Sequence, residues 1–310
     1  MLRYIAKRLF QMIFVLIGVS FMIYFTMDMA PGDLATTILG DEAPIEDIEA
    51  LREELGLNRP LIVRYFDYMW GLLHGDMGYS YKYNTPAWDL FSARVGLTVR
   101  LSILSICFAV IVSIPFGILS ALKRGTLVDN ALNTFSLIGL ATPNFWVGLM
   151  LIILFSLKLG WFNSGGYASM KDLVLPMITC GLDHMASYTR TTRSSMIDTM
   201  RQDYLLLARA KGVSERKVTT KHALKNALIP IITIVGMSFS GCVAGATITE
   251  TVFNLQGVGR LTIDAVRSQD VEVVCGNIIM ISLFSSVVLL LIDIIYAFVD
   301  PRIKAKYSKK

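Results

Sequence analysis

The stretch DYLLLARAKGVSERKVTTKHALKNALIP, residues 203–230, carries six Lys or Arg against two acids and leads directly into an apolar run at 227–249. Residues 203–211 have the composition of a short helix. Gly212 then interrupts the pattern, and Ser214 stands where it can cap a second helix. Because glycine accepts a positive φ, the stretch predicts two helices that meet in an elbow at Gly212.

The basic charge of residues 203–230 has two interpretations. A basic loop can rest on anionic lipid headgroups, where each Lys or Arg near the surface contributes roughly 1 kcal/mol. A loop that only fixes orientation needs just a few basic residues, whereas this segment is long, Ala-rich and helix-forming. We therefore interpret it as a docking surface for a partner in the cytosol.

The whole chain has the composition of a membrane protein, with 310 residues, 54% of them hydrophobic, and a mean hydropathy of +0.56. A membrane-spanning helix needs about 20 apolar residues. Five stretches of about this length contain no Asp, Glu, Lys or Arg, and they are 9–27, 101–122, 130–157, 227–249 and 273–292. A sixth segment at 173–189 contains Asp183 and His184, and we expect it to span the membrane as well.

The distribution of Lys and Arg predicts the orientation, because basic loops stay in the cytoplasm. With the N-terminus inside, the cytoplasmic segments hold 19 of the 29 Lys and Arg, whereas residues 30–97 carry eleven acids. The predicted fold is an all-α integral membrane protein with six transmembrane helices, both termini cytoplasmic, and a helical region outside the cell after the first helix. Within that region, 43–56 and 60–73 have helical patterns.

The predicted organisation has four parts. The parts are a first span at 1–29, an external region at 30–97, a core at 98–300 with helices at about 98–122, 131–157, 173–190, 227–249 and 273–299 around a cytoplasmic loop at 191–226, and a basic tail at 301–310.

The N-terminal segment is expected to stay in the protein. A cleaved signal peptide is disfavoured, because the first apolar run is long and Met27-Asp28-Met29-Ala30 is a poor cleavage site. The four cysteines are scattered along the chain, which indicates free thiols and neither a disulfide framework nor a zinc site.

Several short motifs, taken in order, resemble one family. The motifs are Asp203-Tyr204, Ala208-Arg209-Ala210-Lys211-Gly212, His222-Ala223-Leu224-Lys225-Asn226-Ala227-Leu228, Ala30-Pro31-Gly32-Asp33, Leu55-Gly56-Leu57, Gly75-Asp76-Met77-Gly78, Pro143-Asn144-Phe145-Trp146, Glu250-Thr251-Val252-Phe253, Gly257-Val258-Gly259-Arg260 and Asp300-Pro301-Arg302-Ile303. With these motifs the chain resembles permease subunits of ATP-binding-cassette importers, in the version used by the dipeptide, oligopeptide and nickel subfamily, that is, the B-type binding-protein-dependent inner membrane component.

The sequence departs from the family pattern at two places. The general permease loop begins with Glu-Ala-Ala, whereas this chain has Leu206-Leu207-Ala208. Gln256 stands where the subfamily often has proline. Both departures concern residue-level docking contacts.

The resemblance implies the type I importer permease fold and a role for the elbow. In such importers the elbow helix inserts into a groove on an ATPase subunit and passes its motion to the membrane helices. This chain has no Gly-x-x-x-x-Gly-Lys-Ser/Thr loop, so ATP and Mg are expected on partner subunits, and this chain is expected to bind no cofactor. The residues that we expect to couple the two proteins are Ala208, Arg209, Ala210, Lys211, Gly212, Ser214 and Glu215.

The implied partners are a second, homologous permease, two ATP-binding subunits or domains, an extracytoplasmic substrate-binding protein and the lipid bilayer, with no nucleic acid. The implied location is the cytoplasmic membrane of a bacterium or archaeon. Small residues recur every four positions in the fifth span, which favours close packing against the second permease. These residues are Gly236, Ser240 and Ala244 on one row and Gly241 and Gly245 on the other.

Candidates for the translocation path or its gate are Asn144, Phe145, Asp183, Glu250 and Phe253. A charge within a membrane helix is costly unless it faces protein or water. Asp183 and His184 therefore either line the path or lie near Arg190 and Arg193 in ion pairs. Asp293 has the same two interpretations.

The leading function is import of di- and oligopeptides. The alternative within the same architecture is nickel or a metal chelate, yet His74, His184 and His222 lie on separate segments, so no metal site is expected. An intramembrane aspartyl protease using Asp183 and Asp293 is a distant alternative, since neither residue has the expected Gly-x-Gly-Asp context. A membrane scaffold without transport would leave the elbow unexplained.

Overall fold

The computed structural model describes residues 2–30, 32, 34–40 and 42–299. Of these, the side chains of residues 2–7, 240, 244, 245 and 293–299 are left out of the description. The predicted tail at 301–310 and the side chain of Asp293 therefore lie outside the described residues.

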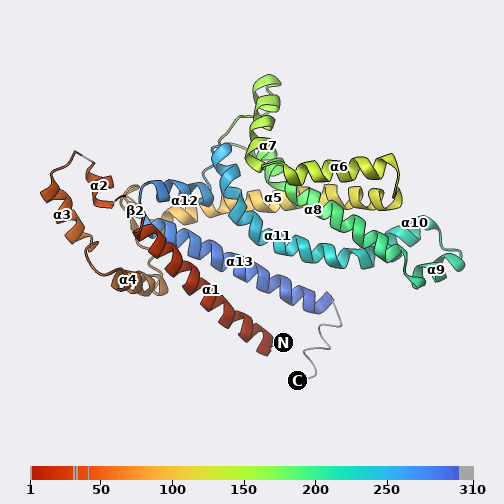
Figure 1. Cartoon of the computed structure of the whole chain (residues 1–310), viewed down its shortest axis with the longest axis horizontal. Helices are drawn as coiled ribbons and strands as arrows, with labels where there is room; N and C mark the ends of the chain where they lie inside the picture. The colour runs from red at the N-terminus through yellow and green to blue at the C-terminus, as the bar shows by residue number, and fades with distance from the viewer. Residues whose placement is uncertain (1, 31, 33, 41, 300–310) are drawn as a thin grey trace. The chain divides into compact units, whose positions relative to one another are not determined.

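The described chain is helical apart from one short hairpin, which confirms the all-α prediction (Figure 1). The elements are α1 Leu2–Asp28, α2 Leu34–Leu39, α3 Ile45–Glu54, α4 Leu61–Leu73, β1 Tyr79–Ser80, β2 Thr85–Pro86, α5 Ala87–Leu122, α6 Leu127–Ala141, α7 Asn144–Leu151, a π-helix Ile152–Lys158, a 3-10 helix Met170–Leu173, α8 Val174–Met200, α9 Asp203–Ala210, α10 Glu215–Lys217, a π-helix Val218–Ala223, α11 Leu224–Val252, α12 Val258–Arg267 and α13 Val271–Val299.

The chain divides into two compact units, Met1–Thr98 with Gln256–Val287, and Val99–Leu255 with Val288–Lys310. In the first unit, apolar side chains of α1, α5, α12 and α13 share one core, which includes Met27, Phe91 and Leu261. In the second unit, α8 packs against α6, α7 and α11.

The predicted helices at 43–56 and 60–73 are present in the first unit as α3 and α4. Each begins directly after a proline, which supplies the fixed φ of a helix start without needing a hydrogen-bond partner for an N–H group. The hairpin β1–β2 pairs Tyr79 with Pro86 and Ser80 with Thr85. The Ser80 hydroxyl donates to the Asp270 carboxylate at 2.5 Å, which ties the hairpin to the residue before α13.

The predicted continuous helix at 131–157 is wrong in one respect. The chain bends by 104° between α6 and α7, and Figure 1 shows α7 turned away from α6. Thr142 is extended, with φ −89° and ψ 125°, because the ring of Pro143 disfavours the helical conformation at the preceding residue. Hydropathy does not register this break.

Four helical stretches within the described residues are long and apolar enough to cross a membrane, or five if α6 and α7 count as one broken span. α8 is not among them, although its 27 residues are long enough. The count of six spans therefore stays a prediction. The four stretches are Arg8–Asp28, Ala87–Leu122, Glu215–Val243 and Val271–Ile292.

Candidate functional site

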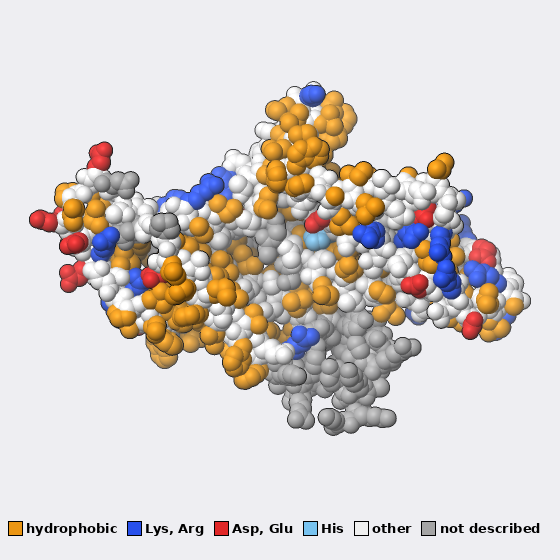
Figure 2. Space-filling model, in the orientation of Figure 1, with side chains coloured by type: hydrophobic (Ala, Val, Ile, Leu, Met, Phe, Trp, Pro, Cys, Tyr) orange, Lys and Arg blue, Asp and Glu red, His pale blue; other side chains and the backbone are white. Residues whose placement is uncertain are grey.

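The helix α9 has one buried anchor and two exposed leucines. Leu205 is fully buried in a cluster with Met196 of α8 and Ala227 of α11. Leu206 and Leu207 are each 58% exposed. Figure 2 shows Lys and Arg side chains gathered over the α9–α10 end of this unit. The buried Leu205 thus holds α9 against α8 and α11, while Leu206 and Leu207 form an exposed apolar surface surrounded by basic side chains.

Gly212 forms the predicted elbow, with φ +76°. The Val213 N–H donates to the Ala208 carbonyl at 3.2 Å, and the Gly212 N–H donates to the Arg209 carbonyl at 2.9 Å, so the end of α9 is closed by the turn itself. Ser214 occupies the N-cap position of α10, but its hydroxyl makes no capping hydrogen bond. The second helix does not stop after α10 and continues through a π-helical stretch into α11.

An ion pair spans the elbow. The Arg209 Nε donates to the Glu215 carboxylate at 2.7 Å, and this hydrogen bond raises the pKa of the Arg209 guanidinium above its usual value. The Glu215 side chain is 65% exposed and the Arg209 side chain 30%, so water screens the pair and it adds little stability. Its effect is geometric, since it joins the residues on either side of Gly212.

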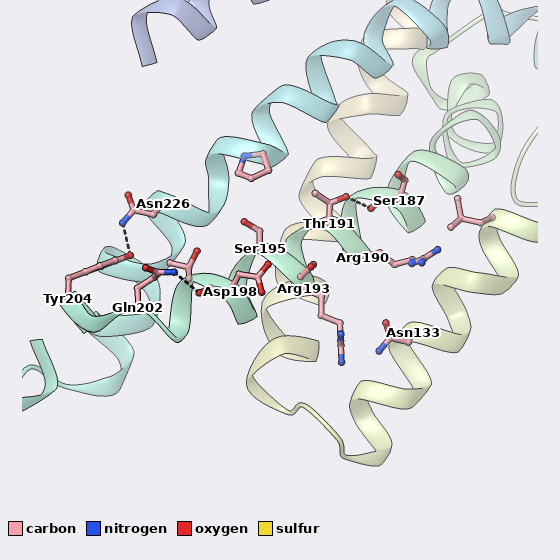
Figure 3. Close-up of a pocket in the computed structure, with 14 residues that line it drawn as sticks. Asn133, Ser187, Arg190, Thr191, Arg193, Ser195, Asp198, Gln202, Tyr204 and Asn226 are labelled. Carbon is pink, nitrogen blue, oxygen red and sulfur yellow. Dashed lines mark hydrogen bonds between the residues drawn. The ribbon is translucent and has the colours of Figure 1, made fainter. Parts of the chain in front are cut away.

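A second tie fastens α9 to the helix that follows the elbow. The Asn226 amide donates to the Tyr204 hydroxyl at 2.6 Å, as Figure 3 shows. Asp203 and Tyr204 begin α9, whereas Asn226 lies in the first turn of α11. This hydrogen bond fixes the orientation of the start of α9 relative to α11.

A partly buried ion pair ties α6 to α8, and sequence reasoning did not identify it. The Arg193 guanidinium donates to both oxygens of the Asp129 carboxylate, at 2.7 and 2.8 Å. The carboxylate also accepts hydrogen bonds from the Ser120 hydroxyl at 2.5 Å and the Gly125 N–H at 2.9 Å. The only hint in the sequence is a single acid within the first turn after a short basic loop.

Asp183 and His184 lie half-buried on α8. The Asp183 carboxylate accepts the N–H of His184 at 2.7 Å. Within the described part of the chain, Asp183 has no ion pair with Arg190 or Arg193. Arg193 is instead engaged by Asp129.

A groove of about 1090 Å³ runs along α8, between α6, α9 and α11. Its α8 residues recur at intervals of three and four, so they form one polar stripe on that helix. Figure 3 shows the groove with side chains from all four helices. The lining residues are Asn133, Leu140, Ser187, Arg190, Thr191, Arg193, Ser194, Ser195, Asp198, Thr199, Gln202, Tyr204, Asn226 and Pro230.

Two of the predicted gate residues, Glu250 and Phe253, lie at the end of α11 that is distant from the elbow. Phe253 is 1% exposed and Glu250 is fully buried. The Gly166 N–H donates to the Phe253 carbonyl at 2.9 Å, and a Cβ at Gly148 would lie 3.1 Å from the Phe253 ring. The end of α11 is therefore enclosed by α7 and by the loop that contains Gly166. Phe145 of α7 is 49% exposed, and Asn144 is half-buried at the start of α7.

Two of the small residues proposed for packing against a second permease can be located. A Cβ at Gly236 would lie 2.7 Å from Ile292, so α13 of the same chain occupies the space beside Gly236. Gly241 is exposed and has no atom within 4 Å of a Cβ position. The side chains of Ser240, Ala244 and Gly245 lie outside the described residues.

Within the described residues there is no group of three or more His, Cys, Asp or Glu that could hold a metal ion.

Comparisons with known proteins agree with one another. The family model described as binding-protein-dependent transport system inner membrane component matches residues 113–305, and the model of the N-terminal part of such membrane components matches residues 1–102. A probable peptide ABC transporter permease protein of Sinorhizobium fredii is 38% identical over 309 residues, which cover 97% of this chain and 99% of the relative.

Two further relatives match over almost their full length. The oligopeptide transport system permease protein AppB of Bacillus subtilis is 37% identical, with 98% of this chain and 100% of the relative covered. The glutathione transport system permease protein GsiC of Escherichia coli is 38% identical, with 99% and 100% covered. Among solved structures, the inward-facing MetNI methionine ABC transporter has a TM-score of 0.58 at 16% identity, over 68% of this chain and 96% of that one. At this identity the structural match concerns the fold.

Proposed function

The chain belongs to the family of binding-protein-dependent transport system inner membrane components, and from that premise we propose that it is a permease subunit that imports short peptides. The relatives described above are permeases for peptides, oligopeptides and glutathione. Their names favour a peptide over the alternative of nickel or a metal chelate. The chain is then a multi-pass protein of a bacterial cytoplasmic membrane.

The observation that carries this proposal is the elbow. α9 exposes Leu206 and Leu207 above a buried anchor, and its orientation is fixed by Tyr204 and by the turn at Gly212. Two adjacent exposed leucines on an ordered helix that is followed by a basic segment are suited to a groove on another protein. We infer that the groove belongs to an ATPase subunit, and that Ala208, Arg209, Ala210, Lys211 and Glu215 shape the contact.

We also propose that two permeases enclose the path. The polar stripe on α8 supports this, because hydroxyl, amide and charged side chains on a long helix need water or protein rather than lipid beside them. Phe253 is suited to close the outer end, since it is enclosed by α7 and the Gly166 loop. An extracytoplasmic binding protein would deliver the peptide at this end.

Reconstitution in proteoliposomes tests the function. The permease is assembled with its second permease, candidate ATPase subunits and a binding protein, and uptake of labelled trialanine is measured with and without ATP. We expect uptake to need ATP, and ATP hydrolysis to rise when the binding protein is loaded. Uptake of nickel but not of peptide, or no transport at all, would contradict the proposal.

A further inference from the structure

The groove on α8 carries two opposite charges that have no ion-pair partner among the described residues. Arg190 and Asp198 are both exposed and both line the groove. Arg193 also lines it, but its charge is neutralised by Asp129. Figure 3 shows Arg190 on the side of α6 and Asp198 further along α8, toward Gln202 and Tyr204.

The spacing of these two charges corresponds to the length of a short peptide. The Cα atoms of Arg190 and Asp198 lie eight residues apart on one helix, which is an axial separation of about 12 Å at about 1.5 Å per residue. An extended chain spans at most about 3.3 to 3.6 Å per residue, so the two ends of an extended tri- or tetrapeptide lie roughly 10 to 14 Å apart. Longer or blocked peptides would leave one charge without a partner.

The surface between the two charges is suited to a peptide backbone. Thr191 and Ser195 donate their hydroxyl protons to the carbonyls of Ser187 and Ala227, at 3.1 and 2.9 Å, so their oxygens remain as acceptors toward the groove. Ser194 is exposed between them and can donate or accept. Hydroxyl groups bind the amides of any peptide without selecting its side chains.

The buried face of α8 explains why the stripe is directed outward. Tyr188, Thr192 and Met196 are fully buried on the other side of the helix. The helix is therefore fixed in rotation, and the polar stripe cannot turn away from the groove.

We propose that this groove is a binding site for zwitterionic short peptides, in which Arg190 binds the terminal carboxylate and Asp198 binds the terminal ammonium. The inference rests on the proposed function and adds a selectivity within the permease itself. It predicts a preference for free termini and for three or four residues.

The test measures binding in the absence of the binding protein, so that only the membrane complex contributes. The complex of permeases and ATPase subunits is purified in lipid nanodiscs, and equilibrium dialysis is performed with labelled trialanine, N-acetyl-trialanine and trialanine amide. We expect trialanine to bind about tenfold more tightly than either blocked form, because each blocked end loses one charge-assisted hydrogen bond.

Single substitutions test which side chain binds which end of the peptide. Arg190→Gln should abolish the preference for the free carboxylate and leave the preference for the free amine, and Asp198→Asn should do the reverse. Arg190→Lys keeps the charge and should retain most of the carboxylate preference. Arg201→Gln and Asp47→Asn remove exposed charges outside the groove and should leave all three affinities unchanged.

Three results would overturn the inference. The first is absence of saturable trialanine binding, and the second is an equal weakening of all three peptides by either variant. The third is loss of the second permease from the purified complex of either variant, since the groove would then be an interface between permeases. Uptake of trialanine by the wild-type complex is measured in parallel: if it occurs while any of these results is found, only this inference fails, whereas its absence is a failure of the proposed function.

Discussion

Gly212 is the residue at which the direction of the chain changes between α9 and α10. A Cβ at this position would meet no atom within 4 Å, so the glycine is required by its backbone conformation and not by crowding. A side chain on a residue with φ +76° costs roughly 1 to 2 kcal/mol. Relief of that strain would rotate α9 relative to α11.

We expect Gly212→Ala and Gly212→Trp to insert into the membrane at normal levels and to lower peptide uptake several-fold while ATP hydrolysis continues. Gly212→Asn should retain more uptake, because asparagine tolerates the left-handed region better than alanine does. The measurement is uptake per unit of membrane-inserted protein. Gly40→Ala is the matched control, since Gly40 has φ +87° and open space around it but lies outside the elbow. Normal, coupled uptake by Gly212→Trp would show that the elbow conformation is not needed.

Asp172 fixes the loop before α8. Its carboxylate accepts the N–H groups of Ala168 and Ser169 at 2.9 and 2.7 Å and the Asn163 amide at 2.7 Å. The Ala168 and Ser169 N–H groups hold the pKa of this carboxyl below its usual value. A carboxyl with a lowered pKa contributes stability above its unfolded pKa of about 3.9 and loses it as the pH falls through the lower folded pKa.

We therefore expect Asp172→Asn to make the 159–172 loop more susceptible to protease at pH 7 and at pH 5 by the same factor. Below about pH 4 the advantage of the wild type should begin to shrink, and it should be lost as the pH falls through the lower folded pKa, where the carboxylate becomes protonated. The measurement is limited proteolysis of the purified permease across this pH range with an acid-tolerant protease. A difference that grows as the pH falls would contradict the assigned role.

At the scale of elements, α8 links the groove to the elbow, and its position depends on the Asp129–Arg193 pair. Removing one partner leaves the other charged and partly buried, which lowers the free energy of unfolding by about 2 kcal/mol or more.

We expect Arg193→Gln to lower the thermal stability of the purified permease. The double variant Asp129→Asn with Arg193→Gln should recover part of the loss, because no unpaired charge remains. Arg201→Gln, at the exposed end of α8, serves as the control. Additive losses in the double variant would show that the two side chains do not act as a pair.

Local patterns were sufficient to predict several elements. The helices α3, α4 and α9 follow from proline, glycine and acid placement, which act within a few residues. The turn at Gly212 follows for the same reason. Local rules also place Ser214 at a cap, although the capping hydrogen bond is not made.

Other features depend on contacts between distant residues and were not predictable. Arg193 was considered only as a nearby ion-pair partner for Asp183 or His184, whereas its partner Asp129 lies 64 positions away. α8 extends to Met200, beyond the predicted end at 190, because its second half is held by that pair and by packing of Met196 against α11. Hydropathy averages over a window, so it registered neither the polar stripe nor the break at Pro143.

At the scale of the whole molecule, the distribution of charge predicts the orientation that the proposed function requires. Cytoplasmic ATPase subunits can reach α9 only if residues 203–230 lie inside the cell, and a binding protein needs the acidic region at 30–97 outside.

Single cysteine substitutions test the location of both segments: Ser214→Cys lies at the elbow and Glu49→Cys lies at an exposed position on α3. We expect a membrane-impermeant maleimide to label Glu49→Cys in intact spheroplasts and Ser214→Cys only in inverted vesicles. The unsubstituted chain, in which Cys180, Cys242 and Cys275 are buried and Cys107 lies on the spanning helix α5, provides the background. Labelling of Ser214→Cys from outside the cell would place the elbow beyond reach of any cytosolic ATPase, and the inferred coupling of α9 to ATP hydrolysis would have to be abandoned.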